Sequence, residues 1–176
     1  DTLYDFMTVS RFALKSVVEL ARDSVGPAAA GLTVEDVISD LDTTAEEMDH
    51  PYARIPELRA RAFARTLARY NLRDDALVTE MGRTYERLRF APVTPFADAR
   101  RVLEDLAQKY TLCTISNGEQ NMAELGLADL FSFLITATDI GVQKPDPRIF
   151  QAAMDRVGCA PGEMAHVGDS LRSDVA

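Results

Sequence analysis

Three short segments of the chain carry side chains of the kinds that bind phosphate groups and divalent cations in proteins. They are Ser116, Asn117 and Gly118, then Lys144, and then Asp169 and Asp174. A hydroxyl group and a lysine ammonium donate hydrogen bonds to phosphate oxygens, and a pair of carboxylates is a hard oxygen site suited to Mg²⁺. Positioning and charge neutralisation of this sort are most of what phosphoryl transfer requires, although no nucleophile is among these residues.

The elements that must position these residues are three short apolar runs. "TLCTIS" (111–116), "FLITA" (133–137) and "MAHVG" (164–168) each predict a strand. Helical stretches are expected around 119–128 and 147–157, and strands separated by helices form a parallel sheet. Ligands bind beyond the carboxyl ends of such strands, where the candidate residues lie. On the third run, His166 is expected to be a core histidine.

The first half of the chain predicts helices alone. Apolar residues at spacings of three and four predict a helix ending near Gly26, and a second helix is capped by Thr33. A third helix begins near Pro56 and a fourth at residues 74–75. Two prolines within 91–96 then indicate a connector, so an α/β region follows a helical one.

The composition excludes some classes of partner. The net charge is −9, and the 16 arginines and 3 lysines are spread along the chain, which argues against nucleic-acid binding. No run approaches the roughly 18 to 20 apolar residues that a membrane span needs, and no basic region precedes an apolar run at the N-terminus. We therefore expect a cytoplasmic protein that binds a small molecule.

The three segments also resemble a known family. "TISNG" (114–118), "QKPDPRIF" (143–150) and "HVGDSLRSD" (166–174) are similar, in order and spacing, to the second, third and fourth motifs of the haloacid dehalogenase superfamily. The resemblance implies an α/β fold: a three-layer, Rossmann-like parallel sheet core, here truncated, with an all-helical cap inserted after the first motif. The implied domains are a remnant of the first-motif loop at 1–9, the cap at 10–91 and an incomplete core at 92–176.

The family's first motif reads Asp-x-Asp-x-Thr-Leu, and this chain opens with "DTLYD". Aligning Thr2 and Leu3 on the motif places the nucleophilic aspartate three residues before Asp1 and the second aspartate one residue before it. By this register we expect the sequence to be a window on a longer protein, without its first strand and its last sheet elements.

The resemblance assigns the phosphate side of the site to residues from every motif. Ser116 would donate to a phosphoryl oxygen, helped by the backbone of Asn117 and Gly118. Lys144 would neutralise charge on the nucleophile and the phosphoryl group. Thr2 would brace the nucleophile loop beside the substrate.

The resemblance assigns the metal side of the site to the two aspartates of the fourth motif. Asp169 would bind Mg²⁺ directly. Asp174 would either hold a metal-bound water or orient Lys144.

The function implied by the resemblance is that of a Mg²⁺-dependent phosphatase, which acts on a small phosphorylated metabolite through an aspartyl-phosphate. A metal-free 2-haloacid dehalogenase of the same superfamily is an alternative, although those enzymes generally lack the aspartate at the position of Asp169. A phosphomutase is another alternative. From a different class, the protein could be a non-catalytic member that binds a ligand or partner.

Overall fold

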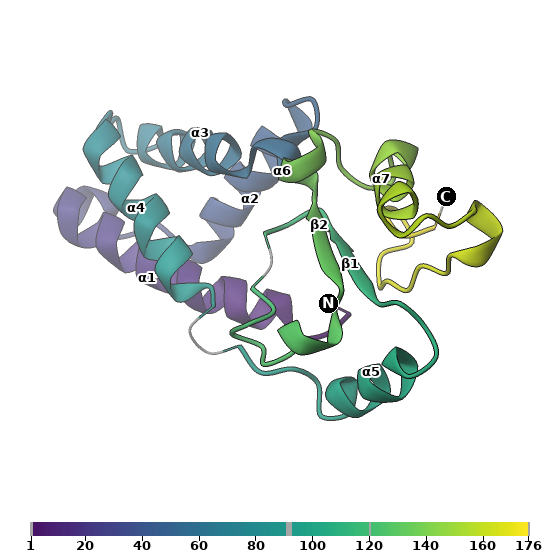
Figure 1. The fold of residues 1–176 in the computed structure, drawn as a ribbon. Coiled ribbons are helices and arrows are strands. Elements are labelled where there is room, and N and C mark those ends of the chain that lie inside the picture. The colour runs from purple at the N-terminus through teal and green to yellow at the C-terminus, as the bar shows by residue number, and fades with distance from the viewer. Residues whose placement is uncertain (1, 91–92, 120, 176) are drawn as a thin grey trace. The chain divides into compact units, whose positions relative to one another are not determined.

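The computed structural model describes residues 2–90, 93–119 and 121–175. The chain divides into two compact units, one of Asp1–Asp5 with Val93–Ala176 and one of Phe6–Pro92 (Figure 1). We refer to them as the sheet unit and the helical unit. Among the described helices, none is long and apolar enough to cross a membrane.

The helical unit is built from the predicted helices. They are α1 (Phe6–Val25), α2 (Val34–Glu46), α3 (Ile55–Ala68) and α4 (Asp75–Leu88). Short 3₁₀ turns at Gly26–Ala29 and Pro51–Arg54 follow α1 and α2. Helix α1 packs against α2 and α4, and α3 packs against the same two helices. The expectation of a helical first half is confirmed.

The helices of this unit begin where side chains satisfy the first amide groups. The Thr33 hydroxyl accepts from the Asp36 amide at 3.1 Å, and the Asp36 carboxylate accepts from the Thr33 amide at 2.9 Å. Asp74 likewise accepts from the Leu77 amide at 2.9 Å. These caps fix both helix starts locally, which is why the sequence predicts them well.

One apolar cluster holds the helical unit together, and it draws on all four helices. Its most buried large side chains come from α1, the α1–α2 connection, α3 and α4: Leu14, Val17, Leu32, Phe63, Leu67 and Met81. Burial of side chains of this size stabilises by about 2 kcal/mol each before the entropy of ordering them is counted.

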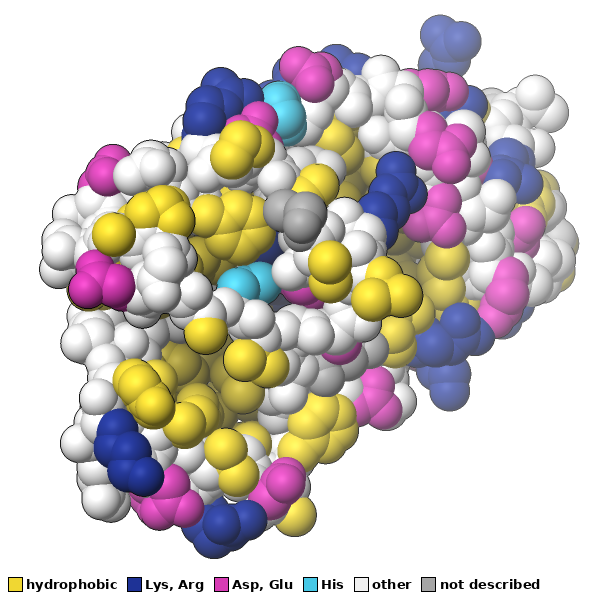
Figure 2. Space-filling model, turned by 90° about the vertical axis from the view of Figure 1, so that its right-hand side faces the viewer, with side chains coloured by type: hydrophobic (Ala, Val, Ile, Leu, Met, Phe, Trp, Pro, Cys, Tyr) yellow, Lys and Arg dark blue, Asp and Glu magenta, His cyan; other side chains and the backbone are white. Residues whose placement is uncertain are grey.

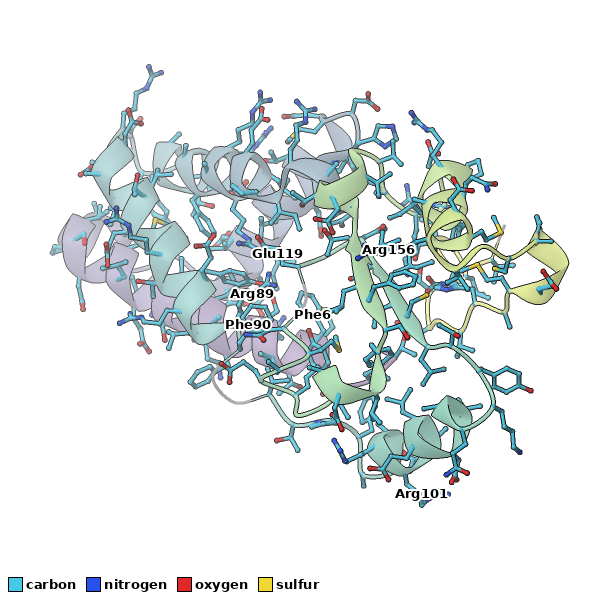
Figure 3. All side chains as sticks on the ribbon, viewed as in Figure 1. Phe6, Arg89, Phe90, Arg101, Glu119 and Arg156 are labelled. Carbon is cyan, nitrogen blue, oxygen red and sulfur yellow. The ribbon has the colours of Figure 1, made fainter. Side chains whose placement is uncertain are left out.

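The sheet unit contains two described strands, β1 (Cys113–Ser116) and β2 (Phe133–Thr136), which pair in parallel with Ser116 opposite Thr136. Three helices accompany them: α5 (Ala99–Ala107), α6 (Ala137–Ile140) and α7 (Pro147–Val157). Helix α7 packs beside β1, as Figure 1 shows, and Arg156 of α7 lies over the Phe133 ring at 4.7 Å (Figure 3). The two strands therefore end at one edge, where the candidate residues begin.

The N-terminal segment belongs to the sheet unit. The Phe96 amide donates to the Leu3 carbonyl at 2.9 Å, and Tyr4 forms an antiparallel bridge with Pro95. Leu3 and Tyr4 also pack on the apolar cluster of Met122, Leu125 and Leu127. These contacts hold Thr2 within the sheet unit, although it is far in sequence from the other candidates.

The prediction of a third strand at 164–168 is wrong in this structure. Those residues have irregular backbone, and in the described part of the chain β1 and β2 pair with each other alone. Val167 is 78% exposed, and Figure 2, which faces this side of the molecule, shows hydrophobic side chains at the surface. A strand needs a neighbouring strand to bond its backbone groups, and among the described residues no strand pairs with this segment.

The prediction of a helix around 119–128 is also wrong. Residues 122–126 form turns, with the Gly126 amide bonded to Ala123 and the Leu127 amide to Met122 at 2.9 Å each. Gly126 has a φ of 65°, a left-handed conformation that ends helical winding. Met122, Leu125 and Leu127 are instead buried in an apolar cluster from a compact turn.

Candidate active site

The carboxyl end of β1 presents the first candidate residues. The Ser116 hydroxyl accepts a hydrogen bond from the Gly118 amide at 3.1 Å, which closes a tight turn directly after the strand. Since a hydroxyl can accept and donate at once, Ser116 keeps its proton for another acceptor. The Gly118 amide, in contrast, is engaged within the turn.

Asn117 fastens this turn to the loop that carries Lys144. Its side-chain oxygen accepts from the Lys144 amide at 2.6 Å, and its side-chain nitrogen donates to the Lys144 carbonyl at 3.1 Å. The side chain thus bonds both backbone groups of one residue, as a neighbouring strand would. Sequence reasoning expected the backbone of Asn117 to assist at the phosphate, and the structure gives its side chain a positioning contact.

Lys144 lies on a short loop between the end of α6 and the start of α7. Helix α6 ends at Ile140 and is followed by Gly141, whose φ of 81° is left-handed. Helix α7 begins after Asp146, whose carboxylate accepts from the Arg148 amide at 2.9 Å. Val142 is buried between them. Lys144, just before the cis Lys144–Pro145 bond, is therefore placed by fixed elements.

The ammonium of Lys144 is paired with Asp174. Nζ lies 2.5 Å from Asp174 Oδ1, and the two side chains are only 11% and 6% exposed. Burial favours the neutral acid, but hydrogen bonds from Lys144, His166 and the Ser170 amide outweigh it and hold the pKa of Asp174 well below its ordinary value. Asp174 is therefore a carboxylate that orients a cation.

A single turn brings Asp174 back onto the loop that begins the motif. The Asp174 amide donates to the Ser170 carbonyl at 2.8 Å, and the Ser170 amide donates to Asp174 Oδ2 at 2.9 Å. A Cβ atom built on Gly168 would lie 2.2 Å from Asp174 Cγ. The carboxylate of Asp174 fits here because residue 168 has no side chain.

The second aspartate, Asp169, is exposed and lies with the N-terminal segment. The Thr2 hydroxyl donates to Asp169 Oδ1 at 2.9 Å. The structure thus brings the first and fourth motifs together through these two residues. The two aspartates differ in their surroundings, because Asp174 is largely buried beside Lys144 and Asp169 is exposed.

The residues described here fit a magnesium ion in part. No group of three or more His, Cys, Asp or Glu side chains with metal-binding geometry occurs among the described residues. Mg²⁺ is commonly held by one or two carboxylates together with water and substrate phosphate, so exposed Asp169 fits as one ligand. Asp174 is instead the largely buried partner of the Lys144 ammonium and of His166.

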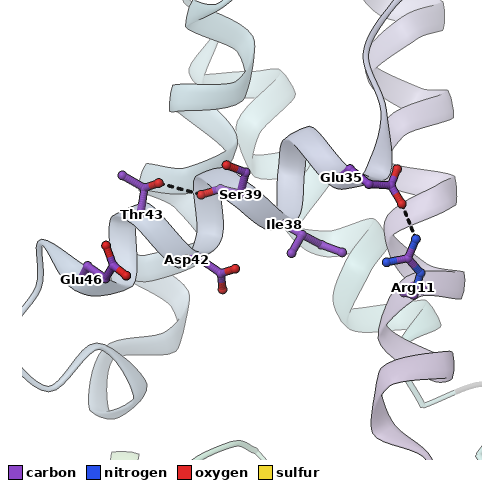
Figure 4. Close-up of a pocket in the computed structure, with 7 residues that line it drawn as sticks. All are labelled: Arg11, Glu35, Ile38, Ser39, Asp42, Thr43 and Glu46. Carbon is purple, nitrogen blue, oxygen red and sulfur yellow. Dashed lines mark hydrogen bonds and ion pairs between the residues drawn. The ribbon is translucent and has the colours of Figure 1, made fainter.

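A surface cavity of about 380 Å³ lies in the helical unit (Figure 4). It is lined by Arg11, Glu35, Ile38, Ser39, Asp42, Thr43 and Glu46. Arg11 pairs with Glu35 and holds its pKa below the ordinary value, and the Thr43 hydroxyl donates to the Ser39 carbonyl at 2.8 Å. None of the candidate site residues lines this cavity.

Comparison with known proteins identifies the family. The family model of the haloacid dehalogenase-like hydrolases matches residues 1–176. The glyceraldehyde 3-phosphate phosphatase of Methanothermobacter thermautotrophicus is 30% identical over 99% of this chain and 76% of that protein. The (S)-2-haloacid dehalogenase 4A of Burkholderia cepacia is 29% identical over 88% of this chain and 68% of that protein.

A solved structure agrees in fold. The crystal structure of a 2-haloacid dehalogenase from Pseudomonas syringae pv. Tomato superimposes with a TM-score of 0.77 at 30% identity, covering 99% of this chain and 76% of that one. The chain therefore belongs to the haloacid dehalogenase-like hydrolase family, and its α/β core with a helical insertion is the fold of that family.

Proposed function

We propose that this hydrolase is a Mg²⁺-dependent phosphatase of a small phosphorylated metabolite. The observation that carries the proposal is the placement of Lys144. Its backbone is bonded to Asn117 at the end of β1, next to Ser116, and its ammonium is held by a buried carboxylate. A relative at 30% identity is named as a phosphatase of glyceraldehyde 3-phosphate, which supports the same class of substrate.

In this proposal the donors of the site act on the phosphoryl group. The largely buried ammonium of Lys144 neutralises negative charge where water screens it little. Ser116 donates its hydroxyl proton to a phosphoryl oxygen while it accepts from the Gly118 amide. The Thr2 hydroxyl donates to one oxygen of Asp169 and so helps to place that carboxylate.

Asp169 would be the ligand that this chain supplies to Mg²⁺. The ion, when bound, neutralises charge on the phosphoryl oxygens and helps to align them. The attacking aspartate, on which the aspartyl-phosphate forms, and the aspartate that protonates the leaving oxygen are those expected before Asp1. The helical unit would be the cap, which excludes water and selects the substrate.

The test is hydrolysis of an aryl phosphate by the intact protein. We expect phosphate release that requires Mg²⁺ and falls at least about 100-fold in Asp169→Ala, as for loss of a metal ligand. Asp155→Ala, which changes an exposed carboxylate on α7, is the matched control and should keep wild-type activity. Phosphate release that is equal with and without Mg²⁺ would contradict the proposal.

A dehalogenase is the second candidate, because a relative at 29% identity and a solved structure at 30% identity carry that name. Its signature is metal-independent release of halide from a 2-haloacid. The presence of Asp169 as an exposed oxygen donor favours the phosphatase. Absence of both activities in the intact, folded protein would favour a non-catalytic member that binds a ligand or partner.

A further inference from the structure

One oxygen of Asp174 is shared by two donors. Oδ1 lies 2.5 Å from Lys144 Nζ and 2.9 Å from His166 Nε2, while Oδ2 accepts from the Ser170 amide. The carboxylate therefore joins a histidine on the irregular segment 164–168 to the lysine of the 141–146 loop. Sequence reasoning expected His166 to be a core residue on a strand, and it is instead a half-buried partner of the site.

The tautomer of His166 follows from its partner. The pKa of Asp174 lies well below its ordinary value, so Asp174 is ionised and can only accept. The hydrogen between the two groups is therefore carried by Nε2 of His166, which donates to Oδ1. As the donor of this hydrogen bond, His166 helps to hold the Asp174 carboxylate in place.

A second contact fixes the ring that makes this bond. The rings of His166 and Phe150 meet edge to face, with centroids 5.2 Å apart and an interplanar angle of 77°. Phe150 belongs to α7, which packs against β1. A side chain of a helix therefore restrains the ring of His166, although His166 itself lies on an irregular segment.

We propose that His166 is a positioning residue that fixes Lys144 through Asp174. Two anchors hold the carboxylate, the Ser170 amide at Oδ2 and His166 at Oδ1, and the carboxylate in turn holds the ammonium. Without the histidine donor, Oδ1 is left to the flexible lysine side chain, and the carboxylate can turn about its remaining anchor. The ammonium then loses its fixed place. An effect of His166 on turnover rests on the proposed function, whereas its effect on the position of the Lys144 ammonium does not.

Two matched variants distinguish the effect of the Nε2 donor of His166 from the effect of its aromatic ring. His166→Phe keeps an aromatic ring beside Phe150 but removes the Nε2 donor. His166→Gln removes the ring but carries an amide N–H at a similar reach. Circular dichroism and the melting temperature of both variants establish that they are folded, and Asp174→Asn serves as the positive control.

The readout is acetylation of lysine side chains by acetic anhydride, quantified by mass spectrometry. The chain has three lysines, and the exposed Lys15 and Lys109 are internal references for the shielded Lys144. We expect the relative rate at Lys144 to rise about fivefold in His166→Phe, because a charge-assisted hydrogen bond is lost from the group that holds it. In His166→Gln the rate should stay within about twofold of wild type.

An unchanged rate in His166→Phe, with an increase in Asp174→Asn, would overturn the proposal. Equal increases in His166→Phe and His166→Gln would overturn it too, since the ring and not the donor would then matter. Aryl phosphate hydrolysis is measured on the same samples, with a fall in kcat and little change in KM expected for His166→Phe. If the labelling follows the prediction but no variant or wild type hydrolyses phosphate, the positioning role stands and the proposed function fails.

Discussion

At the scale of single residues, the candidate site depends on one carboxylate that makes three hydrogen bonds. Asp174 receives donors from a loop, an irregular segment and its own turn. Each donor offsets part of the cost of burying the charge, and together they outweigh it. The position of the Lys144 ammonium is therefore sensitive to any change that moves Asp174.

Gly168→Ala tests this dependence with a single methyl group. The new Cβ would lie 2.2 Å from Asp174 Cγ, so the carboxylate must move away from its donors. We expect acetylation of Lys144 to rise and kcat for aryl phosphate to fall about tenfold or more, the effect of losing about 1.4 kcal/mol of transition-state stabilisation.

Gly162→Ala is the matched control for this prediction. A Cβ at that glycine meets no atom within 4 Å, and neither glycine has a positive φ. The control should leave both readouts unchanged. Wild-type acetylation and turnover in Gly168→Ala would mean that Asp174 can relax without moving Lys144.

The sequence could predict which residues gather at this site but not how they hold one another. Order along the chain and the ends of parallel strands are local signals, and they point to Ser116, Lys144 and Asp169. The clamp by Asn117 and the bond from His166 join segments 27 and 8 residues apart, and no spacing rule encodes them. The glycine before Asp169 was a usable signal, because a residue without a side chain there permits close approach of another group.

At the scale of elements, most helices and the strands β1 and β2 were predictable, whereas the segments 119–128 and 164–168 were not. Caps and apolar periodicity act within one helix, and α1 to α4 and α7 follow them closely. The run 164–168 has strand-like composition, yet a strand depends on a partner that its own residues do not specify. At Gly126 the left-handed backbone conformation ends helical winding, although the spacing of the apolar residues around it is that of a helix.

Helices α2 and α3 are joined by a buried carboxylate. Asp40 is 2% exposed and accepts from the Thr66 hydroxyl at 2.9 Å and from the Arg69 guanidinium at 2.8 and 2.6 Å. Asp40→Ala removes these bonds and leaves the buried Thr66 hydroxyl with one acceptor fewer for its proton. We expect a loss of about 2 to 3 kcal/mol in the free energy of unfolding, measured by urea denaturation.

Asp42→Ala is the control on the same helix. Asp42 is exposed, so its replacement should change stability by less than about 0.5 kcal/mol. Equal stability of the Asp40 and Asp42 variants would show that the α2–α3 contact rests on apolar packing alone.

At the scale of the whole molecule, the candidate site residues that the structure describes lie in the sheet unit. Thr2 reaches it through the contacts of Leu3 and Tyr4 with the connector, and Ser116, Lys144, Asp169 and Asp174 lie on its strand ends and loops. The helical unit has its own apolar cluster and its own buried carboxylate, Asp40, which pairs with Arg69. A hydrolase with this division can vary the helical unit without altering the candidate site residues.

In the described part of the chain each unit has an apolar cluster of its own, which predicts two cooperative units of unfolding. Ile149 of α7 is fully buried in the sheet unit, and Asp40 is buried in the helical unit. In hydrogen exchange followed by mass spectrometry, Asp40→Ala should speed exchange in peptides from Phe6–Pro92 and leave β1, β2 and α7 near their wild-type rates. Ile149→Ala should do the reverse, because it creates a cavity in the sheet unit at a fully buried side chain. Faster exchange throughout the chain in both variants would show instead that the two units open as one.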